Sequence, residues 1–377
     1  MSESIRVLFA AGGTGGHIFP ALAVAQAMQS LAPAVQVSFV GTRHGLESRL
    51  VPRYGFAVDY VDVRFLKGTR LLKKLKHMAL LPRSAWQCWR LLRRLRPQVV
   101  IGAGGYVSGP LVAMASLMGI PTAIMEQNAI AGLTNRLLGP LVRRVFVSFP
   151  GVSYPFKAKK IRALGNPVRE MGDAVADRER RAEALHVLVF GGSQGAVPLN
   201  RQVPRALRAL GEQGTKLVVR HQAGQGRQAE TEEAYAGFAG QVEVSAFIDE
   251  MPGAYRWADL VICRAGATSL AELKAAGKAA ILVPFPRAAH DHQTRNAEAM
   301  VAADAAWMLT DDDLAGDALV TLLQRLLGDP EEVRLRAAKA LALAQPEAAR
   351  DVARESLGMA GWKDPAAARD AAEKGVS

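Results

Sequence analysis

Five small residues and a histidine lie together near the start of the chain. The stretch Gly12-Gly-Thr-Gly-Gly-His17 follows an apolar run at 5–10 and precedes apolar residues at helical spacing at 20–28. Glycines let a backbone approach a ligand closely, and the N-terminus of the following helix carries partial positive charge. Histidine titrates near neutral pH. The stretch could therefore accept a proton beside an anionic or hydroxyl-bearing substrate.

Two common nucleotide-binding loops do not match this stretch. A dinucleotide fold requires Gly-x-Gly-x-x-Gly and an acidic residue at the end of the second strand, about 20 residues further on. Here the second strand-like run, 35–41, ends in Thr42-Arg43. A nucleoside-triphosphate loop requires Gly-x-x-x-x-Gly-Lys-Ser/Thr, and the lysine and the spacing are both absent. For this loop alone, a purely structural strand-to-helix turn remains the alternative.

The same arrangement recurs later in the chain, which favours a functional loop. A second apolar run, 186–190, precedes Gly191-Gly-Ser-Gln-Gly195 and a predicted helix at 198–210. Strand-like runs elsewhere alternate with helix-like ones and lie at 99–102, 122–125, 145–149, 217–220, 242–247, 260–263 and 280–285. Such alternation predicts an α/β protein with parallel sheets covered on both faces. At about 150 residues per domain, 377 residues predict two domains, joined near Leu164-Gly-Asn-Pro167.

Composition is typical of a protein with two hydrophobic cores and no membrane span. Half of the residues are hydrophobic and 22% are charged. The two cysteines, Cys88 and Cys263, are expected to be buried free thiols rather than a disulfide or a metal site. No secretory signal is expected at the N-terminus. The uncharged segment 97–125 is interrupted by glycine and proline, so it predicts a strand, a helix and a strand rather than a span.

The net charge of +12 is concentrated in one segment. No acidic residue lies between Asp62 and Glu126, and eleven lysines and arginines lie within 64–96. Apolar residues are interspersed with them, namely Leu71, Leu72, Leu75, Leu80, Leu81, Trp86 and Trp89. A solvated helix face is one interpretation. Nucleic acid is another, but no recognised binding motif accompanies it. Cations beside exposed leucine and tryptophan favour a third, contact with an anionic lipid surface.

Seven motifs in order carry a resemblance to a known family. They are Gly12-Gly-Thr-Gly-Gly-His17, Gly104-Gly-Tyr-Val-Ser-Gly-Pro110, Glu126-Gln-Asn128, Gly165-Asn-Pro-Val-Arg169, Gly191-Gly-Ser-Gln-Gly195, Cys263-Arg-Ala-Gly266 leading to Glu272, and His292-Gln293 with Asn296. From about Arg6 to Asp311 the chain resembles the MurG family of bacterial N-acetylglucosaminyltransferases. The resemblance implies a GT-B fold, two Rossmann-like domains with parallel sheets facing a cleft. It also implies inverting transfer of GlcNAc from UDP-GlcNAc to lipid I (undecaprenyl-pyrophosphoryl-MurNAc-pentapeptide), forming lipid II in peptidoglycan synthesis, with no cofactor or required metal.

The resemblance also implies a division of labour along the chain. Residues 1–164 form the acceptor and membrane-facing domain, joined by a C-terminal helix at 346–357. Residues 165–345 form the UDP-GlcNAc-binding domain, and 358–377 are expected to be a flexible tail. The expected location is the cytoplasmic side of the inner membrane, bound peripherally through 64–96. Cell-wall synthesis proteins are expected partners, and nucleic acid is not.

On the donor side, the residues carried over from the resemblance would surround UDP-GlcNAc. Ser193, Ala267 and Thr268 would lie near the diphosphate, Ile248 by the uracil, Arg169 against the nucleotide, Glu272 on the ribose, and His292 and Gln293 on the sugar. A carboxylate suits two vicinal hydroxyls because both of its oxygens only accept hydrogen bonds. The acidic run Asp311-Asp-Asp313 precedes a predicted helix, so it is interpreted as a helix cap rather than a metal site.

On the acceptor side, the residues carried over are Thr14, Gly15, Gly16, His17, Tyr106, Glu126 and Asn128. His17 is the candidate catalytic base and Glu126 is its rival. Two positions depart from the family pattern. Met125 replaces the usual histidine and cannot take a proton, so any role of that histidine is absent here, and Ala129 replaces the usual glycine.

Two other functions remain open from the sequence. Non-hydrolysing UDP-GlcNAc epimerases share the architecture and the nucleotide, although they have no use for a cationic patch bearing leucine and tryptophan. A glycosyltransferase acting on another lipid acceptor, such as a diacylglycerol, is the second alternative.

Overall fold

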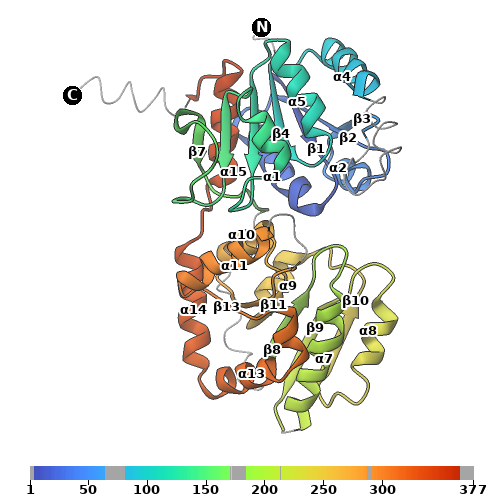
Figure 1. Ribbon diagram of the computed structural model, residues 1–377, viewed down its shortest axis with the longest axis vertical. Coiled ribbons are helices and arrows are strands. Elements are labelled where there is room, and N and C mark those ends of the chain that lie inside the picture. Colours follow the sequence, from blue (N-terminus) through green and yellow to red (C-terminus); the bar gives the residue numbers. More distant parts are fainter. Residues whose placement is uncertain are drawn as a thin grey trace, which may run out of the picture. The chain divides into compact units, whose positions relative to one another are not determined.

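The chain folds into two compact α/β units, seen in the computed structural model of Figure 1. The described residues are 4–63, 81–169, 171, 184–212, 214–286 and 291–365. The first unit comprises Met1–Gln127, Ala131–Arg169 and Pro346–Ser377. The second comprises Asn128–Ile130 and Glu170–Gln345.

The first unit is built on a seven-stranded sheet of order β3-β2-β1-β4-β5-β6-β7, with every pair parallel. Its strands are β1 (Arg6–Ala11), β2 (Gln36–Gly41), β3 (Ala57–Tyr60), β4 (Val99–Gly104), β5 (Thr122–Glu126), β6 (Arg144–Val147) and β7 (Ile161–Ala163). The strands at the centre of the sheet are continuous apolar runs because helices cover both faces.

Two layers of helices cover that sheet. On one face lie α1 (Gly15–Leu31), α2 (Glu47–Arg53) and α15 (Ala348–Met359). On the other lie α4 (Leu81–Leu95), α5 (Ser108–Leu117) and α6 (Leu133–Leu138), and a short 3-10 helix, Ala158–Lys160, precedes β7. Side chains of β1 alternate between the two cores: Val7 and Phe9 pack toward α1, and Leu8 and Ala10 pack toward α5.

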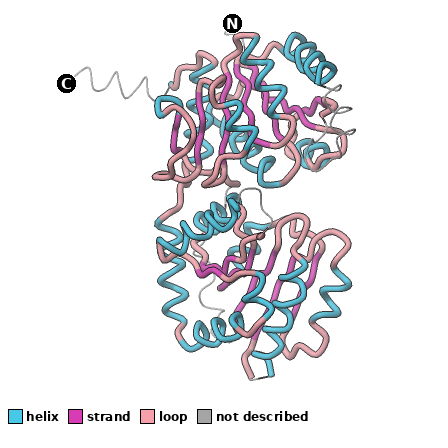
Figure 2. The backbone as a smooth tube through the Cα atoms, in the orientation of Figure 1, coloured by secondary structure: helices cyan, strands magenta, loops and turns pink. Residues whose placement is uncertain are grey.

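The second unit repeats the plan on a six-stranded parallel sheet of order β10-β9-β8-β11-β12-β13. Its strands are β8 (Leu185–Phe190), β9 (Leu217–Gln222), β10 (Gln241–Ser245), β11 (Leu260–Cys263), β12 (Ala279–Leu282) and β13 (Trp307–Met308). Its helices are α7 (Val197–Glu212), α8 (Gln228–Ala234), α9 (Met251–Trp257), α10 (Ala267–Ala275), α11 (His292–Ala302), α12 (Asp311–Ala315), α13 (Ala318–Gly328) and α14 (Pro330–Ala342). Strand and helix alternate from β8 to α12, and α13 and α14 follow without a further strand (Figure 2).

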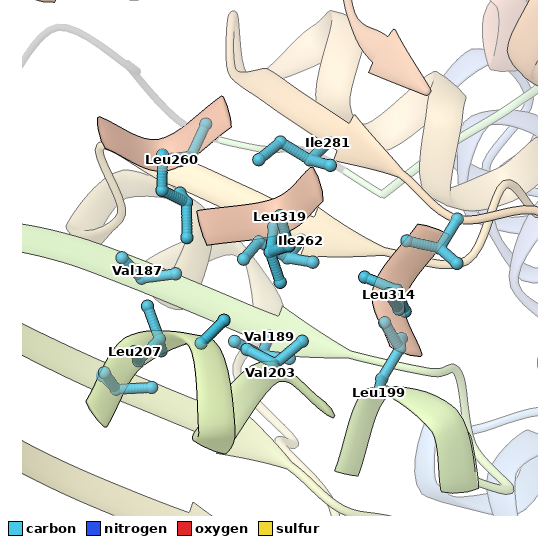
Figure 3. Packing of buried hydrophobic residues seen from close by; sticks show 14 of the residues in the cluster. Val187, Val189, Leu199, Val203, Leu207, Leu260, Ile262, Ile281, Leu314 and Leu319 are labelled. Atoms are coloured by element: carbon cyan, nitrogen blue, oxygen red, sulfur yellow. The ribbon is translucent and has the colours of Figure 1, made fainter. Parts of the chain in front are cut away.

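One hydrophobic core of the second unit lies between the sheet and the helices α7, α12 and α13. Val187 and Val189 of β8 face Val203 and Leu207 of α7 (Figure 3). Ile262 of β11 belongs to the same fully buried cluster. This branched aliphatic packing holds the ends of the central strands in place, and the loops of interest follow those ends.

Strand order reverses at one point in each sheet, between β1 and β4 and between β8 and β11. In open parallel sheets, ligands bind outside the carboxyl ends of strands at such a reversal. The glycine-rich loops of the sequence follow those strands: 12–14 after β1, 105–107 after β4, 191–195 after β8 and 264–266 after β11. The topology therefore places all four loops where ligand sites form.

The predicted α/β architecture is confirmed, and the predicted strands differ from the observed ones only at their ends. Three strands were not predicted, namely β3, β7 and β13. Each has four residues or fewer and lies at a sheet edge. An edge strand has one neighbour and is less buried, so it lacks the continuous apolar run that marks a central strand.

The ordered C-terminal region extends further than the sequence predicts. Helix α15 ends at Met359 rather than 357, and the Trp362 N–H donates to the carbonyl of Leu357 at 3.0 Å. Met359, Ala360 and Trp362 pack on the core beside α1. A tail beginning at Gly358 is therefore incorrect for residues 358–362, because their apolar side chains cover that core.

The described residues contain no helix long and apolar enough to cross a membrane. The uncharged segment 97–125 divides into β4, α5 and β5, as predicted. Cys88 and Cys263 are buried free thiols, which is also confirmed.

Candidate active site

The first glycine loop leads directly into α1. Thr14 is the residue before the helix, and its carbonyl accepts hydrogen bonds from the N–H groups of His17 (3.1 Å) and Ile18 (3.3 Å). Gly15, Gly16 and His17 therefore form the first turn of a 17-residue helix. Unbonded N–H groups and the positive end of the helix dipole gather at such a turn.

Glycines at the end of β4 make room for the His17 ring. A Cβ atom at Gly104 would lie 2.3 Å from Nδ1 of His17, and a Cβ at Gly105 would lie 2.2 Å from the carbonyl oxygen of Gly12. Both glycines have positive φ, +107° and +81°. Only glycine fits at 104 and 105, so the two motifs that begin at Gly12 and at Gly104 form one structure. Tyr106 follows and is 47% exposed.

A buried carboxylate that sequence analysis missed holds the first loop from behind. Glu47, the first residue of α2, is 1% exposed. Its Oε2 accepts from the Gly13 N–H at 3.1 Å, and its Oε1 accepts from the N–H (2.7 Å) and hydroxyl (2.9 Å) of Thr42. The Glu47 carboxylate thus binds the Gly13 N–H, a donor that could otherwise bind an anionic ligand. The sequence signal was Glu47 itself, an acidic residue five positions after Thr42, and Thr42 directly follows the second strand.

A buried serine joins the two loops from the other side. The Ser108 Oγ lies 2.8 Å from the carbonyl oxygens of Ala10 and Gly104 and accepts from the Gly104 N–H at 3.1 Å. Gln127 adds a hydrogen bond from Nε2 to the Ala103 carbonyl at 2.8 Å. Side chains therefore link the end of β4, which contacts His17, to the end of β1 and to the residue after β5.

Glu126 is buried and holds a loop of its own unit. Its Oε2 accepts from the Gly132 N–H at 2.9 Å and from Nδ2 of Asn135 at 2.8 Å. The same Asn135 amide donates to the Met125 carbonyl at 3.0 Å. Met125, which replaces the family's histidine, packs as a buried hydrophobic residue in the core of the first unit.

Two of the predicted site residues belong to the unit opposite to the one expected. Arg169, expected at the nucleotide, belongs to the first unit, where its guanidinium lies 4.2 Å from the ring centroid of Phe19. Asn128, expected on the acceptor side, belongs to the second unit. There the buried Asn296 donates to Asn128 Oδ1 at 3.4 Å and accepts from the Ala129 N–H at 3.0 Å.

In the second unit, the loop after β8 packs backbone to backbone against the loop after β9. The Gly195 N–H donates to the Gly192 carbonyl at 3.0 Å. A Cβ at Gly195, which has φ +68°, would lie 1.9 Å from the Ala223 carbonyl oxygen. Ser193 lies within this loop and is half-buried, and α7 follows it. The loop thus has the shape expected of an anion cradle before a helix N-terminus.

The N-terminus of α10 brings together three of the predicted donor-side residues. Gly266 is the residue before the helix, and Ala267 and Thr268 form the first turn. Glu272, one turn later, is 5% exposed, and the fully buried Tyr255 donates its hydroxyl to Oε2 of Glu272 at 3.1 Å. Tyr255 was not predicted, and its hydrogen bond orients the carboxylate.

His292 and Gln293 begin α11, after Asp291 in the left-handed region at φ +56°. Gln293 accepts from the Phe285 N–H through Oε1 at 2.9 Å. The Ile248 N–H, after β10, donates to Oε1 of Gln222 at 2.8 Å. Ile248 and the α11 residues are thus held by contacts within the second unit.

The acidic run 311–313 is a helix start, as predicted, and it has a second use. Thr310 is the N-cap and forms a reciprocal capping box with Asp313. Asp311 instead pairs with the buried guanidinium of Arg264, with Oδ1 to Nη1 at 2.6 Å. Arg264 also donates to the carbonyls of Val283 and Pro284. The described residues contain no group of three His, Cys, Asp or Glu arranged to hold a metal ion.

The predicted residues fall into two groups, one in each unit. The first unit gathers Thr14, Gly15, Gly16, His17, Tyr106, Glu126 and Arg169. The second gathers Asn128, Ser193, Ile248, Ala267, Thr268, Glu272, His292 and Gln293. Duplicated parallel sheets with glycine loops at both reversals define the GT-B class of fold.

Comparison with known proteins identifies that class and its family. Residues 7–147 match the glycosyltransferase family 28 N-terminal domain, and residues 186–354 match the family 28 C-terminal domain. The chain belongs to the MurG family of UDP-N-acetylglucosamine--N-acetylmuramyl-(pentapeptide) pyrophosphoryl-undecaprenol N-acetylglucosamine transferases.

Relatives and solved structures support the family over nearly the full length. The transferase of that name from Alkalilimnicola ehrlichii is 47% identical over 360 residues, covering 94% of this chain and 99% of the relative. That from Anaeromyxobacter dehalogenans is 45% identical over 353 residues, covering 93% and 91%. The crystal structure of Acinetobacter baumannii MurG matches with a TM-score of 0.77 and 34% identity, covering 94% of this chain and 99% of that one. A Neisseria meningitidis UDP-GlcNAc 2-epimerase matches with a TM-score of 0.66 but 13% identity, covering 94% and 99%, so it indicates the fold alone.

Proposed function

We propose that this chain transfers N-acetylglucosamine from UDP-GlcNAc to lipid I, forming lipid II in peptidoglycan synthesis. The observation that carries the proposal is its 45–47% identity, over more than nine tenths of its length, to transferases named for this reaction. The glycine loops at both strand-order reversals supply the chemistry that the reaction needs.

The second unit is the donor half. The loop 191–195 and the N-terminus of α10 direct N–H groups and helix dipoles toward the diphosphate, which becomes the leaving group. Glu272, oriented by Tyr255, accepts from the ribose hydroxyls. Ile248 packs by the uracil, and His292 and Gln293 hold the sugar.

The first unit is the acceptor half, and His17 is the base. Its imidazole lies in the first turn of α1 against Gly104. Glu47 holds the loop before that turn at Gly13, and Ser108 links the ends of β1 and β4 beside it. It takes the proton of the acceptor hydroxyl as that oxygen bonds to the anomeric carbon and the bond to UDP breaks, which inverts the configuration. Thr14, Gly15, Gly16 and Tyr106 line the same half.

Glu126 acts by positioning rather than as the base. Its Oε2 already accepts two hydrogen bonds, from the Gly132 N–H and the Asn135 amide. These hydrogen bonds fix the carboxylate against its own loop, which suits a positioning group. This favours His17 of the two candidates.

The enzyme binds peripherally to anionic lipid at the cytoplasmic side of the inner membrane. Residues 64–80 of the cationic segment, including Leu71, Leu72, Leu75 and Leu80, lie outside the described residues. In the described part, α4 exposes Trp86 (55%) and Trp89 (42%), with Arg90 and Arg93 stacked over them. Amphipathic tryptophans beside arginine suit an anionic lipid interface. Binding at that surface would also place the enzyme beside its partners, the other cell-wall synthesis proteins.

The function is tested by incubating the purified protein with UDP-GlcNAc and a panel of lipid-linked acceptors, following UDP release and product mass. The expected result is UDP release that requires lipid I and a product heavier by one N-acetylhexosamine unit. Conversion of UDP-GlcNAc without an acceptor would indicate the epimerase instead. Transfer only to another lipid, such as a diacylglycerol, would change the acceptor.

A further inference from the structure

Gln222 lies at the point where three strand ends of the second unit meet. It is the last residue of β9, which runs between β8 and β10. The strand register places it beside Phe190 and Ser245, the last residues of those two neighbours. It is 4% exposed, so its polar side chain needs partners within the protein.

The two ends of its side-chain amide bind two different segments. Nε2 donates to the Gly192 carbonyl in the loop after β8 at 2.9 Å. Oε1 accepts from the Ile248 N–H in the segment after β10 at 2.8 Å. Glutamine carries a donor and an acceptor on a side chain of this reach. Glutamate of the same length lacks the donor, and asparagine is one methylene shorter.

The neighbouring backbone reinforces the same bridge. The Ala223 N–H donates to the Ser245 carbonyl at 2.8 Å, and the Ala223 carbonyl packs against Gly195. That carbonyl accepts from Asn200 Nδ2 at 2.8 Å, and Asn200 in turn accepts from Nε2 of the buried His221. The end of β9 is thus held in one position relative to both flanking segments.

We propose that Gln222 is a positioning residue that sets the distance between the diphosphate loop at 191–195 and the uracil-side segment at Ile248. The assignment of those two segments rests on the function proposed above. Because each segment contacts one end of the nucleotide, a fixed distance between them favours a ligand that spans both. If the two segments are already at that distance before binding, the free energy of binding is not reduced by the cost of ordering them.

The proposal is tested by comparing UDP with uridine, which lacks the diphosphate. In the full-length Gln222→Met variant, both hydrogen bonds are lost at nearly constant side-chain volume. The Kd for UDP is expected to rise about tenfold or more, and the Kd for uridine less than about threefold. Calorimetric titration of each ligand measures both values. In steady-state assays, the KM for UDP-GlcNAc should rise more than kcat falls.

Three further variants separate positioning from general damage. Gln222→Asn keeps a neutral amide but is one methylene shorter, so it should lose at least one of the two hydrogen bonds and also weaken UDP more than uridine, without adding a charge beside the diphosphate loop. Glu272→Ala removes a ribose contact that both ligands share, so it should weaken both in the same proportion. Thr231→Val loses the 2.8 Å hydrogen bond from the Thr231 hydroxyl, in α8, to the carbonyl of Arg227, the N-cap of that helix, and should leave both affinities unchanged.

Equal weakening of UDP and uridine in the Gln222 variants, or no weakening, would overturn the positioning role while leaving the donor site intact. If the unmodified protein fails to bind UDP, the proposed donor site fails, and the role of Gln222 fails with it. Thermal unfolding checks that each variant is folded. If Gln222→Met does not fold, Gln222→Asn decides the question.

Discussion

At the scale of single residues, the proposed acceptor half centres on His17 and on the side chains that fix the segments around it. Glycine at 104 leaves room for the imidazole, and Glu47 and Ser108 fix the strand ends on either side. Such fixed surroundings keep a catalytic group in place without the cost of ordering it during each turnover. His17 is thus the proposed reacting group, and Glu47 and Ser108 are positioning groups.

Replacing His17 with alanine is expected to lower turnover by about a hundredfold or more, because the base acts in the transition state. UDP affinity should stay nearly unchanged, since we propose that the donor binds the second unit. The matched variant is Glu126→Gln, whose amide oxygen can still accept from Gly132 and Asn135, so most of the activity should remain. Kinetic assays and UDP calorimetry measure both effects. An inactive Glu126→Gln enzyme beside an active His17→Ala enzyme would exchange the two roles.

Glu272 provides the corresponding test of the donor half. Loss of its carboxylate in Glu272→Ala should weaken UDP binding by about 1.5 to 3 kcal/mol, the range for hydrogen bonds to a charged group. The Tyr255→Phe variant removes only the hydroxyl that orients this carboxylate, so it should weaken UDP by a smaller amount. Calorimetry on folded protein gives both values, and unchanged affinity in Glu272→Ala would rule out a ribose contact.

At the scale of elements, α4 combines a core face with a lipid-compatible face. Cys88, Leu91 and Leu92 are buried against the sheet, and Trp86 and Trp89 point outward. Helical periodicity sorts these residues, since positions three and four apart share a face. A solvated face alone does not need two exposed tryptophans. On the neighbouring helices of the same layer, Leu117, Leu133 and Leu137 are also exposed, which the sequence did not indicate.

The protein is expected to sediment with anionic vesicles at low salt and to be partly released as ionic strength rises, because salt screens the arginines and lysines. The remainder that resists salt should be lost in Trp86→Ser/Trp89→Ser, because apolar contact is not screened. Leu335→Ser, at an exposed leucine of α14, is the matched control and should keep the salt-resistant vesicle binding. All three proteins should stay active on a soluble short-chain acceptor. Equal sedimentation with anionic and neutral vesicles would contradict lipid binding through this helix.

At the scale of the whole molecule, the stability of the second unit depends on a buried neutral histidine. Burial lowers the pKa of His221 from 6.5 to about 3. Its Nε2 donates to Asn200 Oδ1 at 3.1 Å, and its Nδ1 accepts from the Tyr235 hydroxyl at 3.0 Å. Burial raises the pKa of Tyr235, so that hydroxyl keeps its proton. Protonation of Nδ1 would break this arrangement.

Below pH 6.5 the unfolded chain takes up a proton at His221 that the folded unit excludes, down to about pH 3. Stability of the second unit should therefore fall with pH over that window, by at most about 1.4 kcal/mol per pH unit from this group. In the His221→Gln variant, stability should lack this pH-dependent fall. In His44→Gln, which replaces an exposed histidine, the fall should remain. Hydrogen exchange of the β8 and β9 amides between pH 7 and 5 measures the slope. The same slope in His221→Gln as in the unmodified protein would contradict the assignment.

Much of the architecture follows from local sequence patterns. Apolar runs and glycine loops predict the central strands, the helices that follow them and the duplication of the sheet, because buried parallel strands and helix starts leave signals within a few residues. The motif residues at 12–17 and 191–195 are identifiable for the same reason. Strands β3, β7 and β13 left no such signal, because short edge strands are held mainly by their neighbours.

Only the tertiary structure decided which side chains hold these loops. Glu47 binds a loop residue 34 positions away, Ser108 binds Ala10 of β1, 98 positions away, and Gln222 bridges the segments that follow two different strands. Such partners meet because parallel strands align in one register, and register depends on packing across the whole sheet. The same packing set Arg169 over Phe19. The sequence by itself therefore determined the fold class, the family and the candidate base, and long-range packing determined the residues that position them.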